Sequence, residues 1–333
     1  MTTTNTEEVS QPLKFWQAVN QALVQEMERD EKVVLIGEDV AAPGGPYGVT
    51  RGLLDKFGSE RVRDTPISEE ILVGLGIGSA AVGLRPVVEL MFFDFTMLAM
   101  DQIVNQAAKY RYFSGNALPL TIRTMSGVGG SYGAQHCQSF ESWFCAVPGL
   151  KVVMPSNARD AKGLLKAAIR DDDPTLVIEP YGLLTNRRET PISEDFVLPL
   201  GVAEIRREGS DVTVVATGRL VDRALEAAQI LDLEDISVEV IDPRTLSPLD
   251  HDTITASLLR TGRLVVAQEA TSPCSVASEI CAVASERCFG KLKAAPIRVT
   301  SPFVNVPTPM DLVETRAPGV EDVLAAIRKT LEK

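Results

Sequence analysis

Apolar positions in the first half of the chain alternate between helical and strand spacing. Residues 15–29 repeat apolar side chains every three or four positions, which predicts a helix, and residues 158–170 show the same pattern. Short apolar runs typical of buried strands occur at 33–36, 86–91, 120–123, 152–154 and 176–178. A further helix is expected from the end of the second run to about residue 110. This alternation predicts a largely parallel sheet with helices on both faces.

The pattern is interrupted by a polar, proline-containing segment near 181–200 and then restarts. Strands are expected at 212–216, 238–241, 264–267 and 297–299, and helices at 221–231, 275–287 and 320–331. The predicted fold class is therefore α/β, with two doubly wound domains. We predict a disordered tail at 1–11, a first domain at 12–185, a linker at 186–205 and a second domain at 206–333.

Composition narrows the partners of this 333-residue chain. Its net charge of −12 disfavours binding to nucleic-acid phosphates or to an anionic membrane surface. No apolar run reaches the ~20 residues of a membrane-spanning helix, and the first residues lack a signal or transit pattern, so a cytoplasmic protein is expected.

The five cysteines form no closely spaced pair, which predicts free thiols in a reducing compartment. Cys274, Cys281 and Cys288 recur every seven residues, and we interpret them as small core residues on one helical stripe.

The segment Asp64 to Glu70 places carboxylates at the start of an apolar, glycine-rich stretch. By themselves, Ser68 and Glu69 fit the beginning of a helix, where a serine caps the backbone and an acidic side chain faces the positive helix end. Residues 76–81 match the G-x-G-x-x-A dinucleotide fingerprint. That fingerprint requires a preceding strand, whereas this match follows the glutamate turn and a helical-looking segment, which disfavours nicotinamide binding.

Two further segments place functional residue types where predicted strands end. Met91 and Phe95 lie at the end of one strand, where their side chains could either flank a flat heterocycle or pack in the core. His136 follows a loop with four glycines in the seven residues 127–133 and directly precedes a predicted helix. That position makes it a better functional candidate than an isolated histidine, which is more often structural.

Taken together, these segments resemble the beta subunits of the thiamine-diphosphate-dependent pyruvate, branched-chain 2-oxo acid and acetoin dehydrogenases. The resemblance extends from about residue 12 to the end and rests on many motifs in one order. Segments 89–92 and 123–125 are closer to acetoin-type sequences than to pyruvate enzymes. The matching runs are 37–40, 61–69, 83–86, 89–95, 101–103, 135–136, 148–153, 160–165, 168–171 and 244–250.

The resemblance implies a pyrimidine-binding domain followed by a transketolase-type C-terminal domain. Glu69 stands at the position of the family's catalytic, cofactor-activating glutamate, which bonds the N1′ nitrogen of the aminopyrimidine ring. Met91 and Phe95 match residues that contact the pyrimidine, and His136 matches a catalytic histidine near the substrate and the acyl acceptor. The resemblance also implies a potassium site, built mainly from backbone carbonyls, at Leu120, Ala168, Ile169, Asp171 and Asp173.

Partners are implied as well. The family's diphosphate motif, G-D-G followed by N-N, holds Mg²⁺ and lies in an alpha subunit, and this chain contains no G-D-G. The chain is therefore expected to form half of each active site in an α2β2 heterotetramer, and to act with an acyltransferase core or another acyl carrier. The expected reaction is oxidative decarboxylation of a 2-oxo acid, pyruvate by preference, with acyl transfer to a lipoyl domain. Alternatives are acetoin as donor, two-carbon transfer to a carrier protein, or NAD-dependent oxidation through residues 76–81.

Overall fold

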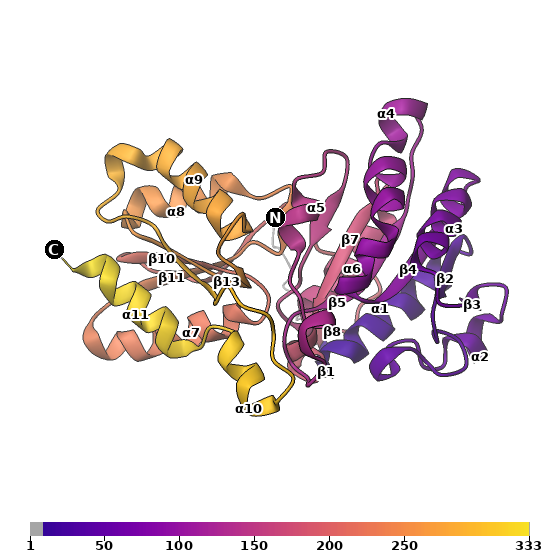
Figure 1. The fold of residues 1–333 in the computed structure, drawn as a ribbon, viewed down its shortest axis with the longest axis horizontal. Helices are drawn as coiled ribbons and strands as arrows, with labels where there is room; N and C mark the ends of the chain where they lie inside the picture. The colour runs from indigo at the N-terminus through magenta and orange to yellow at the C-terminus, as the bar shows by residue number, and fades with distance from the viewer. Residues whose placement is uncertain (1–8, 333) are drawn as a thin grey trace, which may run out of the picture.

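The computed structural model describes residues 9–332, and Figure 1 shows two α/β domains side by side. The first domain is built on a seven-stranded sheet of order β12-β6-β7-β5-β4-β2-β3, in which all strands except β12 run parallel. Its elements are β1 (Ser10–Lys14), α1 (Phe15–Arg29), β2 (Val33–Gly37), α2 (Leu53–Phe57), β3 (Val62–Asp64), α3 (Glu69–Ala81), β4 (Arg85–Phe92), α4 (Tyr110–Ser114), β5 (Thr121–Ser126), α5 (Glu141–Cys145), β6 (Lys151–Val153), α6 (Ala158–Arg170), β7 (Thr175–Pro180) and β8 (Arg187–Pro191).

The second domain is built on a five-stranded sheet of order β14-β13-β10-β11-β9, in which only the edge strand β9 is antiparallel to its neighbour. Its elements are β9 (Glu204–Arg207), β10 (Val212–Ala216), α7 (Leu220–Leu231), β11 (Val238–Asp242), β12 (Thr245–Ser247), α8 (His251–Thr261), β13 (Leu264–Thr271), α9 (Val276–Cys288), β14 (Ile297–Ser301), α10 (Met310–Val313) and α11 (Val320–Leu331). None of the described helices is both long and apolar enough to span a bilayer.

Fully buried strands show that both faces of the larger sheet are covered. Every residue of β2 and β5 is buried, as expected for parallel strands enclosed on both sides. On one face, α1 and α6 pack against the sheet and against each other. On the other face, a cluster containing Leu72 of α3 and Ile122 of β5 continues into Ile241 and Leu258 of the second domain. One of the apolar clusters therefore spans both domains.

Strand pairing also crosses the domain boundary. β12 lies in the second half of the chain, yet it pairs antiparallel with β6 and completes the edge of the first sheet. β1 and β8 form a separate two-stranded antiparallel sheet that ties the beginning of the first domain to its end. Residues 10 and 11 of the range expected to be a disordered tail form the start of β1, and β8 lies in the range expected to be a linker. Residues 1–8 of that tail lie outside the described part of the chain.

A buried pair of carboxyl groups lies at the domain junction. Asp242 ends β11 and is fully buried, and it accepts hydrogen bonds from the Ser156 hydroxyl and from the Arg244 amide, at 3.0 Å. Asp160, in the first turn of α6, is also fully buried and lies 3.4 Å from Nη1 of Arg206. Burial, together with the neighbouring Asp160 carboxylate, raises the pKa of Asp242 to about 7.

Two further predictions from the sequence are wrong. Residues 93–110 do not form one regular helix but a 3₁₀ helix (Phe93–Ala99), a π helix (Gln102–Ala107) and the start of α4, because the Thr96 hydroxyl bonds the Phe93 carbonyl at 2.6 Å and favours the tighter turn. Cys274 is exposed and precedes α9, with a φ of 53°, so it does not share a core stripe with the buried Cys288.

Candidate functional site

Glu69 is the first residue of α3, which follows β3 after a short turn. β3 ends at Asp64, and the Thr65 amide then bonds the carbonyl oxygen of Gly37 at 3.0 Å, which fixes the turn to the end of β2. Ser68 occupies the N-cap position but its hydroxyl makes no capping hydrogen bond. Glu69 is only 6% exposed, and its carboxylate accepts no hydrogen bond from any residue that the structure describes. The carboxylate oxygens of Glu69 are not among the fully enclosed side-chain atoms that lack a partner, so they reach the surface and are open to a donor from outside this chain.

A second carboxyl group lies near Glu69. Glu38 directly follows β2, and burial together with the charge of Glu69 raises its pKa above the usual range. Gly37 makes the turn possible, because a Cβ there would lie 2.6 Å from the Val40 side chain and 2.9 Å from Glu89. β2, β3 and β4 run parallel, and β4 continues three residues beyond its last pair with β2. Glu38, Glu69 and the residues after β4 therefore lie toward the carboxyl edge of the sheet.

An aromatic cluster occupies the same edge. The His136 ring lies 5.1 Å from the Phe92 ring and 5.2 Å from the Phe95 ring, both edge to face. Phe92 also contacts Tyr132, with ring centroids 5.5 Å apart. α3 packs against β4 and against the 3₁₀ helix that carries Phe95, so Glu69 and the aromatic cluster belong to neighbouring elements. The structure thus brings His136 and Phe95 together, with Met91 half-buried at the end of β4.

Three tyrosine hydroxyls meet beside this cluster. Tyr47 follows β2, Tyr132 lies in the glycine loop and Tyr181 directly follows β7. The Tyr47 hydroxyl contacts that of Tyr132 at 3.0 Å and also that of Tyr181, and the Tyr132 and Tyr181 hydroxyls are 3.2 Å apart. Burial raises the pKa of Tyr181, so this group stays a neutral donor at physiological pH.

Asp94 is a buried acid next to His136 that was not selected from the sequence. Its Oδ1 accepts a hydrogen bond from Gln138 at 2.6 Å, while its Oδ2 has no partner among the described residues. Burial raises the pKa of Asp94, and the hydrogen bond from Gln138 opposes that shift. The residue is 3% exposed, so its free oxygen can bind only a ligand, a water molecule or a proton.

A buried cluster of one arginine and two glutamates links three neighbouring strands of the first sheet. Arg123 of β5 pairs with Glu89 on β4 and with Glu179 on β7, where Nε and Nη2 donate at 2.9 and 2.8 Å. All three side chains are buried, and burial raises the pKa of both glutamates. One arginine therefore holds two carboxyl groups in adjacent parallel strands, which fixes the strand ends that carry the site.

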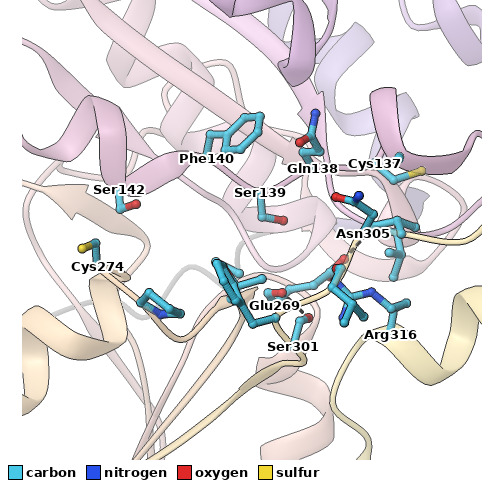
Figure 2. A pocket seen from close by; sticks show the side chains of 18 of the residues that line it. Cys137, Gln138, Ser139, Phe140, Ser142, Glu269, Cys274, Ser301, Asn305 and Arg316 are labelled. Carbon is cyan, nitrogen blue, oxygen red and sulfur yellow. Dashed lines mark hydrogen bonds between the residues drawn. The ribbon is translucent and has the colours of Figure 1, made fainter.

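A cavity of about 480 Å³ lies between the two domains and is lined by Cys137 and Gln138, the two residues that follow His136 in the chain. Figure 2 shows Cys137 and Gln138 on its first-domain side and Glu269, Ser301 and Asn305 on its second-domain side. The volume is in the range of small-molecule sites. Burial raises the pKa of Cys137 to about 11, so this thiol stays protonated near neutral pH and is a poor nucleophile.

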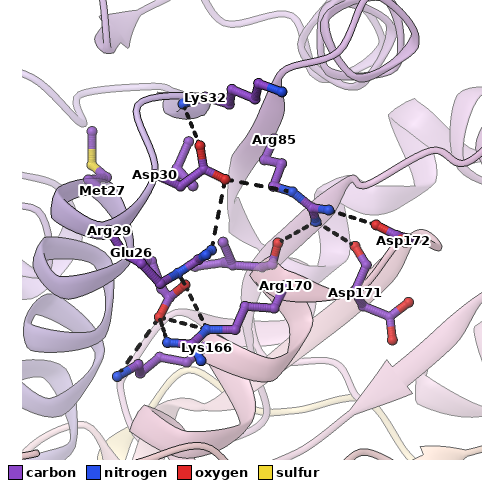
Figure 3. A network of polar contacts seen from close by, with 12 residues as sticks. Glu26, Met27, Arg29, Asp30, Lys32, Arg85, Lys166, Arg170, Asp171 and Asp172 are labelled. Atoms are coloured by element: carbon purple, nitrogen blue, oxygen red, sulfur yellow. Dashed lines mark hydrogen bonds and ion pairs between the residues drawn. The ribbon is translucent and has the colours of Figure 1, made fainter. Parts of the chain in front are cut away.

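The residues of the expected potassium site surround the end of α6 and the starts of β5 and β7. Figure 3 shows that Arg85 reaches this region, where its Nη1 donates to the carbonyl oxygens of Ile169 (3.1 Å) and Asp171 (3.0 Å). The Leu120 carbonyl accepts from the Thr175 amide at 2.9 Å. A guanidinium group thus already supplies positive charge at two of the expected carbonyl ligands.

The other members of this set are also bonded. The Ala168 carbonyl accepts from the Asp171 amide at 3.2 Å, and the Asp173 carboxylate accepts from Arg111 at 2.5 Å. Lys151 pairs with the Asp171 carboxylate at 2.6 Å. Each of these carbonyl oxygens keeps a second lone pair. The set therefore fits a potassium ion only if the ion binds in addition to the hydrogen bonds that these oxygens already accept. Among the described residues, no group of three His, Cys, Asp or Glu side chains is arranged to hold a metal ion.

Figure 3 also shows the polar contacts between α1 and α6. Glu26 is fully buried and receives Nη2 of Arg170 at 2.7 Å and Nε of Arg29 at 2.7 Å. The Lys166 ammonium lies 3.8 Å from Glu26, and that lysine is fully buried as well. This network stabilises the helix pair far from the carboxyl edge.

The glycines of the dinucleotide-like match do not form a phosphate-binding loop. Residues 76–81 lie inside α3, and a Cβ on Gly76 would lie 2.6 Å from Val88 and 3.0 Å from Leu120. These glycines therefore allow the helix to approach the sheet closely, and the NAD hypothesis is wrong for this segment. The structure instead adds Glu38, Asp94 and the three tyrosines. Glu38, Asp94 and Tyr181 come one or two residues after a strand and could have been found by that position, whereas Tyr47 and Tyr132 lie farther from the strands that precede them.

Comparisons with known proteins agree with this architecture. Residues 11–186 match the family described as transketolase, pyrimidine binding domain, and residues 201–323 match transketolase, C-terminal domain. The chain is 44% identical over 320 residues to the human mitochondrial pyruvate dehydrogenase E1 component subunit beta, covering 94% of this chain and 89% of that protein. It is 46% identical over 327 residues to the acetoin:2,6-dichlorophenolindophenol oxidoreductase subunit beta of Cupriavidus necator, covering 95% and 96%. Among solved structures, a split gene transketolase, an inactive beta4 tetramer, has a TM-score of 0.78 at 25% identity and covers 96% of this chain and 98% of that one.

Proposed function

This chain belongs to the transketolase-like beta subunits of thiamine-diphosphate-dependent 2-oxo acid dehydrogenases, and we propose that it forms the cofactor-activating half of a pyruvate dehydrogenase component. The other half is an alpha subunit that holds the diphosphate and most of the Mg²⁺ coordination. The products are carbon dioxide and an acyl group that passes to a lipoyl domain of an acyltransferase core.

The observation that carries the proposal is the state of Glu69. It lies within the matched pyrimidine-binding segment, is nearly buried, and accepts no hydrogen bond from the described residues. An aminopyrimidine nitrogen is the kind of partner that such a carboxyl group can bind, and the half-buried Met91 and Phe95 offer apolar contacts to a flat ring. When bound, thiamine diphosphate would supply a carbon nucleophile for the 2-oxo group and an electron sink for the decarboxylation.

Each residue of this chain then has a separate task. Glu69 would hold the ring nitrogen of the cofactor through a hydrogen bond, which its largely buried position would strengthen. His136 stands against Phe92 and Phe95, where it can exchange a proton with the substrate or with the incoming acyl acceptor. Tyr47, Tyr132 and Tyr181 bring three hydroxyl groups together at the rim of the site.

An apolar stripe on α3 supports the alpha subunit as partner. Ile71 is 69% exposed and Val82 is 82% exposed, and Leu75 and Gly78 complete the stripe at helical spacing. A Cβ on Gly78 would meet open space, so another backbone can approach this helix closely. Glu69 begins the same helix. A subunit bound to the stripe would therefore also lie beside the end of the cofactor opposite to the pyrimidine ring that Glu69 binds. In Figure 1, α3 lies on the side of the first domain away from the second domain, which leaves the stripe accessible.

The test is reconstitution with a co-expressed alpha subunit. The assay measures reduction of an artificial electron acceptor with pyruvate, branched-chain 2-oxo acids and acetoin as donors, with and without thiamine diphosphate. We expect Glu69→Gln to lower turnover at least ~100-fold while the complex still assembles. The matched control is Glu70→Gln, because Glu70 is the exposed neighbour and its variant should retain activity. Wild-type turnover in Glu69→Gln would refute the proposal.

Assembly has its own test. Ile71→Asp combined with Val82→Asp is expected to prevent co-purification with the alpha subunit, because two charges would be desolvated in the interface. Leu233→Asp is the control, since Leu233 is a 90% exposed residue of the second domain. Sedimentation of the wild-type complex should give an α2β2 mass. Equal recovery of alpha subunit by the double variant would exclude this stripe as the interface.

Acetoin is the second candidate donor, favoured by the 46% identity to the acetoin oxidoreductase subunit. Comparing turnover with acetoin and with pyruvate decides between the two donors. The acyl acceptor is identified separately, by measuring transfer to a purified lipoyl domain and to another purified carrier protein.

Two finer parts of the proposal concern potassium and location. We propose that potassium binds through the second lone pairs of Ile169 and Asp171, which predicts a higher melting temperature in KCl than in choline chloride at equal ionic strength. Five free cysteines support a reducing compartment, and we propose the cytoplasm, which cell fractionation tests.

A further inference from the structure

The glycine loop that leads to His136 is held by the second domain. Glu269 lies on β13, and its Oε1 accepts a hydrogen bond from the Val128 amide at 2.5 Å. Arg219 lies between β10 and α7, and its Nη1 donates to the Val128 carbonyl oxygen at 3.2 Å. Both polar groups of Val128 are thus bonded by side chains from adjacent strand ends of the other domain.

The two side chains also contact each other. Nε of Arg219 lies 3.7 Å from Oε2 of Glu269, and these side chains are only 11% and 14% exposed. The pair therefore interacts in a poorly hydrated environment, where it keeps a fixed orientation. We call Glu269, Arg219 and the Val128 peptide groups the interdomain clamp.

Two glycines provide the space that the clamp needs. A Cβ on Gly127, whose φ is +83°, would lie 2.6 Å from Oε1 of Glu269. A Cβ on Gly182 would lie 3.0 Å from Nη1 of Arg219. The glycine content of this loop region is therefore explained by close approach of charged side chains and not only by mobility.

The other end of the loop is held by the same domain. Val128 and Cys137 form a small apolar cluster with Val313 and Ala317 of the second domain. His136 directly precedes Cys137, so the second domain fixes the chain on both sides of the segment that presents the histidine.

We propose that Glu269, with Arg219, is a positioning residue that acts through the loop on His136 and leaves the Glu69 half of the chemistry unaffected. This inference rests on the proposed function, because it assigns a separate step to each end of the site. Loss of the clamp lets the loop shift, and a displacement of about 1 Å at a reacting group costs up to about 100-fold in rate.

The experiment compares two assays on the assembled complex with its alpha subunit. Reduction of an artificial acceptor reports cofactor activation and decarboxylation, whereas acylation of a purified lipoyl domain also reports the acyl transfer that His136 serves. Glu269→Ala is expected to lower kcat for lipoyl acylation about 10- to 100-fold and to leave artificial-acceptor turnover within about twofold. Glu269→Gln keeps an oxygen acceptor for Val128, so its loss is expected to be smaller.

Three further variants separate positioning from general damage. Glu279→Gln, at an exposed residue of α9, is the matched control and should behave as wild type in both assays. Gly127→Ala keeps Glu269 but displaces it, so it is expected to give the same selective loss even where Glu269→Ala fails to fold. Adding Glu269→Ala to His136→Ala should cause no further loss of acylation, because both changes act on one group.

The outcomes are distinct. An equal fall in both assays, no fall in either, or additive losses in the double variant would overturn the positioning role and leave the proposed function standing. A wild-type complex inactive in both assays would instead overturn the proposed function itself.

Discussion

Replacing Asp242 by asparagine is expected to reduce the loss of stability that accompanies a rise in pH from about 4 to about 7. Asp242 is fully buried, and burial beside the Asp160 carboxylate raises its pKa from 3.8 to about 7. The folded chain therefore binds this proton more tightly than the unfolded chain does. The contribution of Asp242 to the unfolding free energy is therefore highest below pH 3.8, falls as the pH rises toward 7, and is constant above pH 7.

The size of the effect follows from that pKa difference. A shift of about three units, at about 1.4 kcal/mol each, corresponds to a loss of about 4 kcal/mol of unfolding free energy between the two limits. Asparagine has the same shape and no charge. Its amide oxygen can accept the Arg244 hydrogen bond, and its amide nitrogen can donate to the Ser156 hydroxyl, so both contacts of Asp242 are kept.

The assay is the melting temperature of the assembled protein from pH 5 to pH 8.5. Asp242→Asn is expected to melt above wild type at pH 8, and the difference should shrink toward pH 5. The control is Asp235→Asn, which removes the same charge at an exposed position where φ is 56°, a conformation that asparagine tolerates. Parallel pH profiles for wild type and Asp242→Asn would refute the assignment of the buried proton to this carboxyl group.

Three other substitutions test the packing. Glu26→Ala is expected to cost about 3–5 kcal/mol in urea unfolding, because it leaves the fully buried Lys166 without its carboxylate. Gly149→Ala should yield little folded protein on expression, because φ is +91° and the new Cβ would overlap the Ala108 carbonyl oxygen. Arg123→Met leaves two buried glutamates without a cation, so its melting temperature should fall increasingly below wild type as the pH rises from 5 to 8.

Amphipathic helices and buried parallel strands were predictable because one face or both faces of each must be apolar. The predicted ranges 15–29, 158–170 and 320–331 coincide with α1, α6 and α11, and the α/β fold class and the family resemblance are confirmed. The short strands β1, β3, β8, β9 and β12 were not predicted. β8 is exposed over its first three residues, and such a strand is defined by its distant partner rather than by its own pattern.

The site was predictable only in part for a related reason. Glu69 alone had the signature of a helix start, and only the full order of motifs gave it a catalytic role. Phe95 and His136 were selected singly, and the structure brings their rings to 5.2 Å. Tyr47, Tyr132 and Tyr181 are distant in sequence and meet only because three parallel strands end at one edge. The roles of Glu69, Met91, Phe95 and His136 stay predictions until the variants are measured.

The pairing of β12 with β6 affects how the chain can fold as it is synthesised. Thr245 pairs with Val153, so the edge of the first sheet lacks its last strand until that later segment has been translated. At a synthesis rate of about 5–20 residues per second, β6 stays an open edge for roughly 5–20 s. An open edge can pair with another nascent chain, and chaperone binding during this interval would protect it. Moving translation pauses to positions before or after residue 247 should therefore change the yield of native protein without changing any side chain.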